Sequence, residues 1–158
     1  MRRPQSASFK QAVLDTPEVA QFLCDGLQAL TKGDRKKIAY TNSRALVGSL
    51  SLDEALSSQY PNDPIWDYGI GVTVTVGSDN VKWLEVHPAS SQHIDEVLKK
   101  LRWLRHWLTN SAPELEALPR EFVWIASGKV SLQKGSPQMK KLAQAGLRFV
   151  GEKFFLKA

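Results

Sequence analysis

Three residues on two neighbouring predicted strands have the types and the spacing to bind a divalent metal ion. Asp67 begins the first strand, and Glu85 and His87 lie two positions apart at the end of the second. Side chains two apart on a strand project from the same face, so Glu85 and His87 lie together. Two carboxylates and one imidazole can hold a divalent cation and orient a water for attack on phosphorus. These residues therefore indicate metal-dependent hydrolysis; the alternative is an edge strand with polar residues at its end.

The strands that carry these residues alternate in the manner of a β-hairpin. Apolar residues occupy every second position from 68 to 76, and the turn-forming stretch 77–80 leads into a second strand over 81–87. A turn centred in that stretch pairs Asp67 with Ser90, about 17 Å from Glu85 along the strand at ~3.3 Å per residue. A bulge at one of the two glycines of the first strand would bring Asp67 beside Glu85.

Helices and further strands are expected around the hairpin. Apolar spacing after Thr16 predicts a helix over 16–33 with Cys24 in its core face, and a second amphipathic helix over 91–109. Strands over 122–126 and 147–156 flank a helix that begins at Ser136 and ends at Gly146. We therefore expect a flexible N-terminus over residues 1–8 and a single α/β domain over 9–158. Its core is a single mixed β-sheet flanked by helices.

This element order and the polar residues of the hairpin resemble the PD-(D/E)XK nuclease superfamily, whose fold is called restriction-endonuclease-like. The resemblance covers about residues 16–156 and rests on Asp67, on the sequence Glu85-Val86-His87, and on Glu18 in the first predicted helix. It implies a restriction-endonuclease-like topology, with Mg²⁺ or Mn²⁺ bound by Asp67 and Glu85 and assisted by Glu18. It also implies cleavage of DNA or RNA, or nucleic-acid binding by a degenerate relative.

His87 stands where this motif has a lysine. A neutral imidazole lacks the fixed positive charge of an ammonium, although it can serve as a base or a ligand. Lys129, at the exit of the next predicted strand, is a candidate to supply that charge. His93 offers another possibility, because His87, His93 and Glu85 together would make a two-histidine, one-carboxylate site for iron or zinc.

Positive charge is concentrated at the C-terminal end of the chain. The formal net charge is +5, and residues 129–158 hold seven Lys or Arg residues and one acidic residue. Such a surface suits a polyanion, because each phosphate contact releases a condensed counterion. We expect nucleic acid to bind through Lys134, Lys140, Lys141 and Arg148. The rival hypothesis is a non-enzymatic protein-interaction module that uses this basic surface and exposed aromatic side chains; a homodimer is a further option.

Several other classes of protein are excluded by what the sequence lacks. It has no run of about 18 apolar residues and no apolar stretch after Arg2 and Arg3, so neither a membrane span nor a secretory signal is expected. Cys24 is the only cysteine, which rules out an intramolecular disulfide and a cysteine-rich zinc site. The stretch 127–129 lacks the flanking residues of a phosphate-binding loop. We therefore expect a cytoplasmic protein without membrane contacts.

Overall fold

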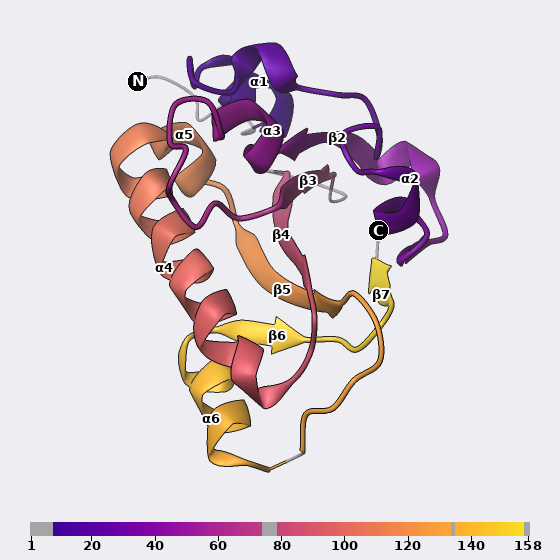
Figure 1. Cartoon of the computed structure of the whole chain (residues 1–158). Helices are drawn as coiled ribbons and strands as arrows, with labels where there is room; N and C mark the ends of the chain where they lie inside the picture. The colour runs from indigo at the N-terminus through magenta and orange to yellow at the C-terminus, as the bar shows by residue number, and fades with distance from the viewer. Residues whose placement is uncertain (1–7, 74–78, 134, 157–158) are drawn as a thin grey trace, which may run out of the picture.

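A mixed β-sheet of five strands, flanked by helices, organises the fold (Figure 1). The computed structural model describes residues 8–73, 79–133 and 135–156. The strand order is β2-β3-β4-β5-β6, in which β2, β3 and β4 are antiparallel neighbours and β4, β5 and β6 are parallel neighbours. The predicted α/β class with one mixed sheet is therefore confirmed for the main sheet. Its strands are β2 (Leu46–Ser51), β3 (Tyr68–Val72), β4 (Asn80–His87), β5 (Arg120–Ala126) and β6 (Leu147–Phe149).

Helix α4 (Ile94–Ser111) crosses one face of the sheet (Figure 1). Its buried residues recur at three and four positions, as the amphipathic pattern over 91–109 predicts. Among the residues that the structure describes, no helix is long and apolar enough to cross a membrane. The other helices are short: α1 (Phe9–Leu14), η1 (Ala20–Phe22), α2 (Lys32–Arg35), η2 (Ser43–Ala45), α3 (Leu52–Leu56), η3 (Ser91–His93), α5 (Pro113–Glu116) and α6 (Pro137–Gln144).

The register of the β3–β4 hairpin places Asp67 opposite Glu85. Tyr68 pairs with Leu84, so the residues just outside that pair face each other. The predicted pairing of Asp67 with Ser90 is therefore wrong. Asp67 reaches Glu85 without the bulge that the predicted register would have required, since the described β3–β4 pairing is continuous; a register shift occurs between β2 and β3. The error lies in the turn, because β3 ends eight residues before β4 begins; residues 74–78, on which much of the predicted turn falls, are outside the described residues.

The sheet separates two apolar cores. Trp83 and Trp124 belong to the core beneath α4, and Leu84 and Ile125 belong to the core on the other face. This division follows from the alternation of side chains along each strand. It also determines the position of Glu85, which shares the α4 face with Trp83.

The expected single helix over 16–33 is wrong. The backbone at Cys24 pairs with Ser49 of β2 in an isolated bridge, so this stretch extends the edge of the sheet. Val19 and Leu30, whose spacing suggested one helical face, are buried in different cores. Val19, Leu27 and Leu30 are buried as expected, whereas Phe22 and Leu23 are only partly buried. The apolar periodicity of this stretch came from two packing surfaces.

The predicted strand over 147–156 is divided at Gly151, which has a φ of 80°. This left-handed conformation suits glycine and turns the chain away from β6. The continuation, β7 (Phe154–Leu156), pairs in parallel with β1 (Ile38–Tyr40) as a separate two-stranded sheet.

Two glycines in β3 make room for aromatic rings of the core. A Cβ atom on Gly69 would lie 2.5 Å from Cζ3 of Trp83, and one on Gly71 would overlap the ring of Phe9. Phe9 and Trp83 are both fully buried, so neither ring can move aside without disturbing its neighbours.

We expect Gly71→Ala to lower the free energy of unfolding by about 1–3 kcal/mol, because overpacking forces a buried ring from its position. Urea denaturation measures the change. Gly128→Ala is the matched control, since no heavy atom lies within 4 Å of an added Cβ there. Equal effects of the two substitutions would contradict the close packing of Phe9 against β3.

Candidate functional site

The carboxylates of Asp67 and Glu85 each accept a hydrogen bond from the backbone of the segment that carries the other residue. The backbone N–H of Asp67 donates to Oε1 of Glu85 at 3.1 Å, and the N–H of Val86 donates to Oδ2 of Asp67 at 2.9 Å. This reciprocal arrangement requires the β3–β4 register described above. It leaves one oxygen of each carboxylate for another partner.

That partner is the ammonium group of Lys100 on α4. Its Nζ lies 3.3 Å from Oδ1 of Asp67 and also pairs with Oε2 of Glu85. Lys100 lies three residues after Val97 and four before Leu104, both buried on the face of α4 that packs on the sheet. The rotation of α4 that buries its apolar stripe therefore directs Lys100 toward the two carboxylates.

Burial controls the charges of this group. Glu85 is fully buried, and the Asp67 side chain is 24% exposed. Burial, followed by the charge of Glu85, raises the pKa of Asp67 to about 7, against the opposing influence of Lys100. Burial alone would lower the pKa of Lys100, but the charges of Glu85 and Asp67 outweigh it and raise that pKa above its ordinary value. The pKa of Lys100 is therefore displaced further above neutral pH, whereas that of Asp67 is raised into the neutral range.

His87 extends the group toward the N-terminus of α4. Its Nδ1 lies 3.4 Å from Oε2 of Glu85, and its Nε2 lies 2.9 Å from Oε2 of Glu96. The contact with Glu85 raises the pKa of His87; burial opposes this rise and Glu96 adds to it. His87 thus lies between two carboxylates.

Asp67 also lines a hollow of about 250 Å³ that opens beside the hairpin. Three more carboxylates line it, so it favours cations over anions. Its lining residues are Ala29, Thr31, Asp34, Ser51, Asp53, Glu54, Asp67 and Tyr68.

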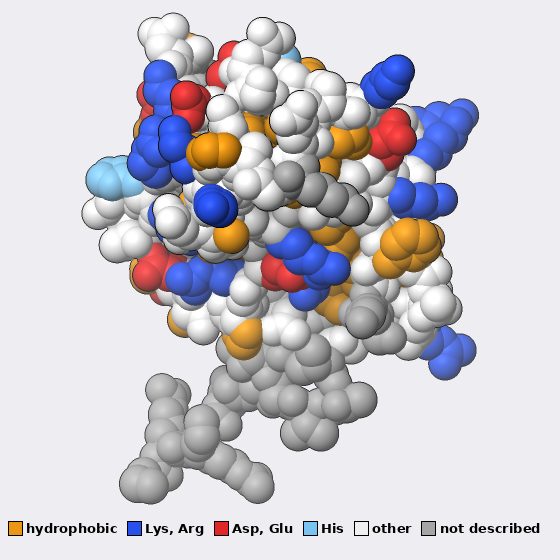
Figure 2. Space-filling view, turned by 90° about the horizontal axis from the view of Figure 1, so that it is seen from below, with side chains coloured by type: hydrophobic (Ala, Val, Ile, Leu, Met, Phe, Trp, Pro, Cys, Tyr) orange, Lys and Arg blue, Asp and Glu red, His pale blue; other side chains and the backbone are white. Residues whose placement is uncertain are grey.

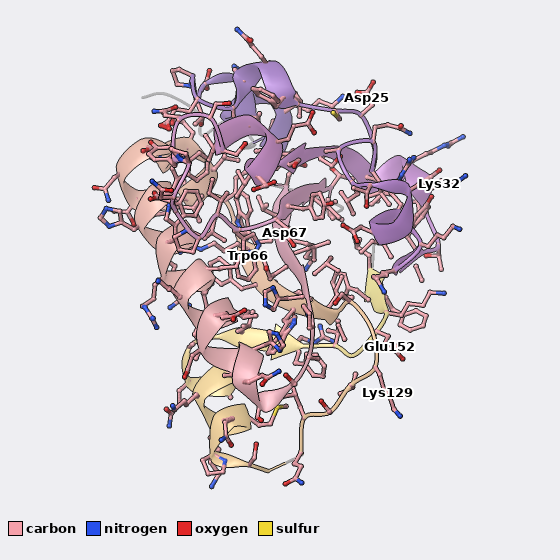
Figure 3. The ribbon with its side chains drawn as sticks, viewed as in Figure 1. Asp25, Lys32, Trp66, Asp67, Lys129 and Glu152 are labelled. Carbon is pink, nitrogen blue, oxygen red and sulfur yellow. The ribbon has the colours of Figure 1, made fainter. Side chains whose placement is uncertain are left out.

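The other two predicted catalytic residues lie apart from this group. Glu18 accepts a 2.6 Å hydrogen bond from the hydroxyl of Tyr60 rather than joining the carboxylates. Lys129 is exposed on the loop after β5, well away from Asp67 (Figure 3). The positive charge assigned to Lys129 is supplied at the carboxylates by Lys100.

The predicted nucleic-acid-binding residues are distributed over α6 and β6. Lys140 and Lys141 are exposed on α6, and Lys141 lies 4.0 Å from Asp95 on the first turn of α4. Arg148 on β6 forms an ion pair with an acidic residue of β5 at 3.2 Å. Lys134 falls outside the described residues. Figure 2 shows basic side chains on this side of the molecule in separate groups, with acidic side chains among them.

The sequence analysis did not identify two residues that contact the predicted site, Lys100 and Glu96. Lys100 carries a detectable signal, because a lysine spaced three and four residues from buried positions lies at the border of the apolar stripe. Glu96 carries a weaker one, since an acidic residue in the first turn of a helix is ordinarily explained by the helix dipole.

Removing the Lys100 ammonium should destabilise the protein strongly. We expect Lys100→Met to lower the free energy of unfolding by about 3–5 kcal/mol near neutral pH, because it leaves buried carboxylate charge uncompensated. Lys99→Met, at an exposed position on the same helix, should change it by less than about 0.5 kcal/mol. Chemical denaturation measures both.

A double variant separates charge from packing in this experiment. Glu85→Gln removes one negative charge and should restore part of the stability that Lys100→Met loses. A double variant that is less stable than Lys100→Met would contradict the role assigned to the ion pair.

No protein-family model, curated protein or solved structure matches the chain. The function therefore has to be argued from the chemistry of Asp67, Glu85, Lys100 and His87. Two carboxylates that share a cation, beside a histidine and an acidic hollow, are the basis of that argument.

Proposed function

We propose that the chain is a divalent-metal-dependent phosphodiester hydrolase that acts on nucleic acid. The observation that carries the proposal is that Oδ1 of Asp67 and Oε2 of Glu85 contact the same cation, the ammonium of Lys100. Carboxylate oxygens directed at one point are the ligands that Mg²⁺ and Mn²⁺ prefer. The proposal requires the side chain of Lys100 to move aside when a metal ion binds.

The surroundings of the carboxylates fit a hard divalent cation. The acidic hollow lined in part by Asp67 attracts cations to this side of the hairpin. The backbone N–H groups that hold Oε1 of Glu85 and Oδ2 of Asp67 keep the other two oxygens in place. A bound ion of this kind polarises a phosphoryl oxygen and lowers the pKa of a coordinated water.

The remaining residues have roles that follow from their charges. Lys100, after moving aside for the metal ion, supplies positive charge near the carboxylates, which suits the charge that develops on a phosphoryl group in the transition state. It thereby replaces the lysine that the PD-(D/E)XK motif has at the position of His87. His87, which contacts Glu85, helps to orient that carboxylate.

The order of elements supports a restriction-endonuclease-like topology as part of this proposal. Helix α1 precedes the antiparallel strands β2, β3 and β4, and α4, β5, α6 and β6 follow. Asp67 precedes the second of these strands and Glu85 lies near the end of the third. This is the placement that the resemblance implies for the two metal ligands.

A relative that binds nucleic acid without cutting it is the second candidate. The favouring observation is that Lys100 already compensates both carboxylates and that Glu85 is fully buried. A protein that never binds the metal ion would keep this arrangement. Cleavage and binding assays separate the two candidates.

Substituting either carboxylate should abolish cleavage. We expect Asp67→Asn or Glu85→Gln to lower Mg²⁺- or Mn²⁺-dependent cleavage of labelled DNA or RNA by at least about 100-fold, which corresponds to roughly 2.7 kcal/mol of transition-state stabilisation. Glu114→Gln, at an exposed site, should cut like the wild type, and circular dichroism checks folding. Absence of cleavage by the wild type, or full activity in Asp67→Asn, would contradict the enzymatic proposal.

Binding should depend on the basic residues of α6. With Lys140→Glu and Lys141→Glu combined, we expect weaker binding of a duplex oligonucleotide and a shallower dependence on salt, by about 0.9 in log–log slope for each lost phosphate contact. Fluorescence anisotropy over a salt series measures both quantities.

The matched control combines Lys32→Glu and Lys36→Glu, two exposed lysines at α2. Figure 1 shows α2 far from α6, so this control makes the same change in net charge at another place. Equal losses in the two double variants would show that net charge alone drives binding, and would contradict the assignment to α6.

A further inference from the structure

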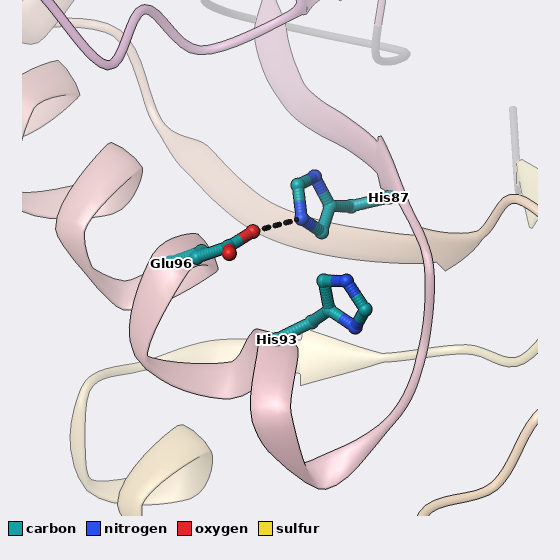
Figure 4. Close-up of side chains that lie close together, drawn as sticks. All are labelled: His87, His93 and Glu96. Atoms are coloured by element: carbon teal, nitrogen blue, oxygen red, sulfur yellow. Dashed lines mark hydrogen bonds and ion pairs between the residues drawn. The ribbon is translucent and has the colours of Figure 1, made fainter.

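A second group of metal-ligating side chains lies where β4 ends and α4 begins. His87 is the last residue of β4, His93 ends η3, and Glu96 lies in the first turn of α4. One ligand atom of each lies within 4.8 Å of the others. Figure 4 shows the two rings and the carboxylate grouped between the strand and the helix.

Each histidine has its Nδ1 engaged by a neighbour, which leaves Nε2 for a ligand. Nδ1 of His87 lies 3.4 Å from the buried Glu85 carboxylate, and Nδ1 of His93 lies 2.6 Å from Oγ of Ser90. A carboxylate at the second nitrogen is a usual support of a metal-binding histidine, because it fixes the tautomer and the orientation of the ring. The hydroxyl of Ser90 restrains the orientation of the His93 ring. The two imidazoles are therefore set to offer Nε2.

The backbone around these residues is fixed by β5 and the loop that follows it. The carbonyl of His87 accepts hydrogen bonds from Nε1 of Trp124 and from the N–H of Ser127, both at 3.1 Å. The N–H of Ser131 donates to the carbonyl of Ala89 at 2.9 Å. The backbone that carries His87 thus loses little further conformational entropy when an ion binds.

The spacing of the ligand atoms suits a tetrahedral ion after small side-chain movements. Ligands about 2.0–2.1 Å from a tetrahedral zinc ion lie about 3.3–3.4 Å from one another. Nε2 of His87 and Oε2 of Glu96 are 2.9 Å apart, so this pair has to open slightly. The Glu96 side chain is 61% exposed and free to make that adjustment, and an ion can approach from solvent on its side.

We propose that His87, His93 and Glu96 form a binding site for a late first-row divalent ion such as zinc, with one coordination position left for solvent. Two imidazole nitrogens select this class of ion over Mg²⁺, which prefers oxygen ligands. The carboxylate ligand is Glu96 and not Glu85, which supports His87 from its other nitrogen. This site shares no metal ligand with the proposed magnesium site, and the proposal does not depend on hydrolysis.

Zinc titration of the full-length, untagged chain tests the site. Isothermal titration calorimetry should give one zinc ion per chain. Loss of a residue that only supports a metal ligand costs roughly 10–100-fold in affinity, so loss of a ligand itself, in His93→Gln or Glu96→Gln, should cost at least about 100-fold. Controls are His106→Gln and Asp95→Asn, which change exposed residues of the same helix and should leave the affinity unchanged.

Two further measurements locate the ion. Co²⁺ should give the visible absorption of a tetrahedral nitrogen–oxygen site in the wild type and lose it in His93→Gln. Asp67→Asn, which should abolish the proposed hydrolysis, should keep its zinc affinity, so the two proposals can fail separately. Absence of stoichiometric zinc binding, or equal affinity in the wild type and His93→Gln, would overturn the proposal. An affinity that falls in Asp67→Asn but not in His93→Gln would overturn it as well.

Discussion

The buried carboxylate of Glu85 is the constraint on which the centre of this structure depends. Transferring a carboxylate from water into an apolar core costs several kcal/mol unless charges and hydrogen bonds compensate it. Here one oxygen accepts the N–H of Asp67, and the other pairs with Lys100 and lies near His87. These partners come from the segment before β3, from α4 and from the end of β4. Compensation of one charge therefore holds three parts of the chain together.

This requirement favours the observed register of the β3–β4 hairpin. A shift of β4 by one residue would exchange its faces and move Glu85 into the apolar core that contains Leu84 and Ile70. Lys100 could not then pair with Glu85, because α4 packs on the opposite face of the sheet. The native register keeps the carboxylate beside Lys100 and also brings the N–H of Val86 to Asp67. Charge compensation and apolar packing thus favour the same alignment.

The features that were predictable from the sequence are those with local signals. The large side chains that alternate over 68–72 face one core, and the apolar residues spaced by three and four over 94–108 face the other; both elements are present. The stretch 16–33 was mispredicted because its apolar residues serve two cores, which a single periodicity cannot represent. The pairing of Asp67 with Glu85 was missed because the predicted register assumed a turn centred in the stretch 77–80, whereas Tyr68 pairs with Leu84 in the structure. Lys100 was missed because its partners lie 15 and 33 residues away along the chain.

The two proposed metal sites meet at a single oxygen atom. Oε2 of Glu85 pairs with Lys100 on the side of Asp67 and faces Nδ1 of His87 on the other side. An oxygen that coordinates a hard divalent ion offers less negative charge to the N–H of an imidazole, and the basicity of the opposite ring nitrogen falls accordingly. In the proposed arrangement, an ion at the carboxylates would lower the affinity of Nε2 of His87 for a metal ion. An ion at His87 would in turn strengthen the hydrogen bond from its Nδ1–H to Glu85. Because binding coupling is reciprocal, each ion would oppose the other through this oxygen. In this proposal, the shared buried carboxylate would make the hard-oxygen site and the imidazole site competitors, even though their preferred ions differ.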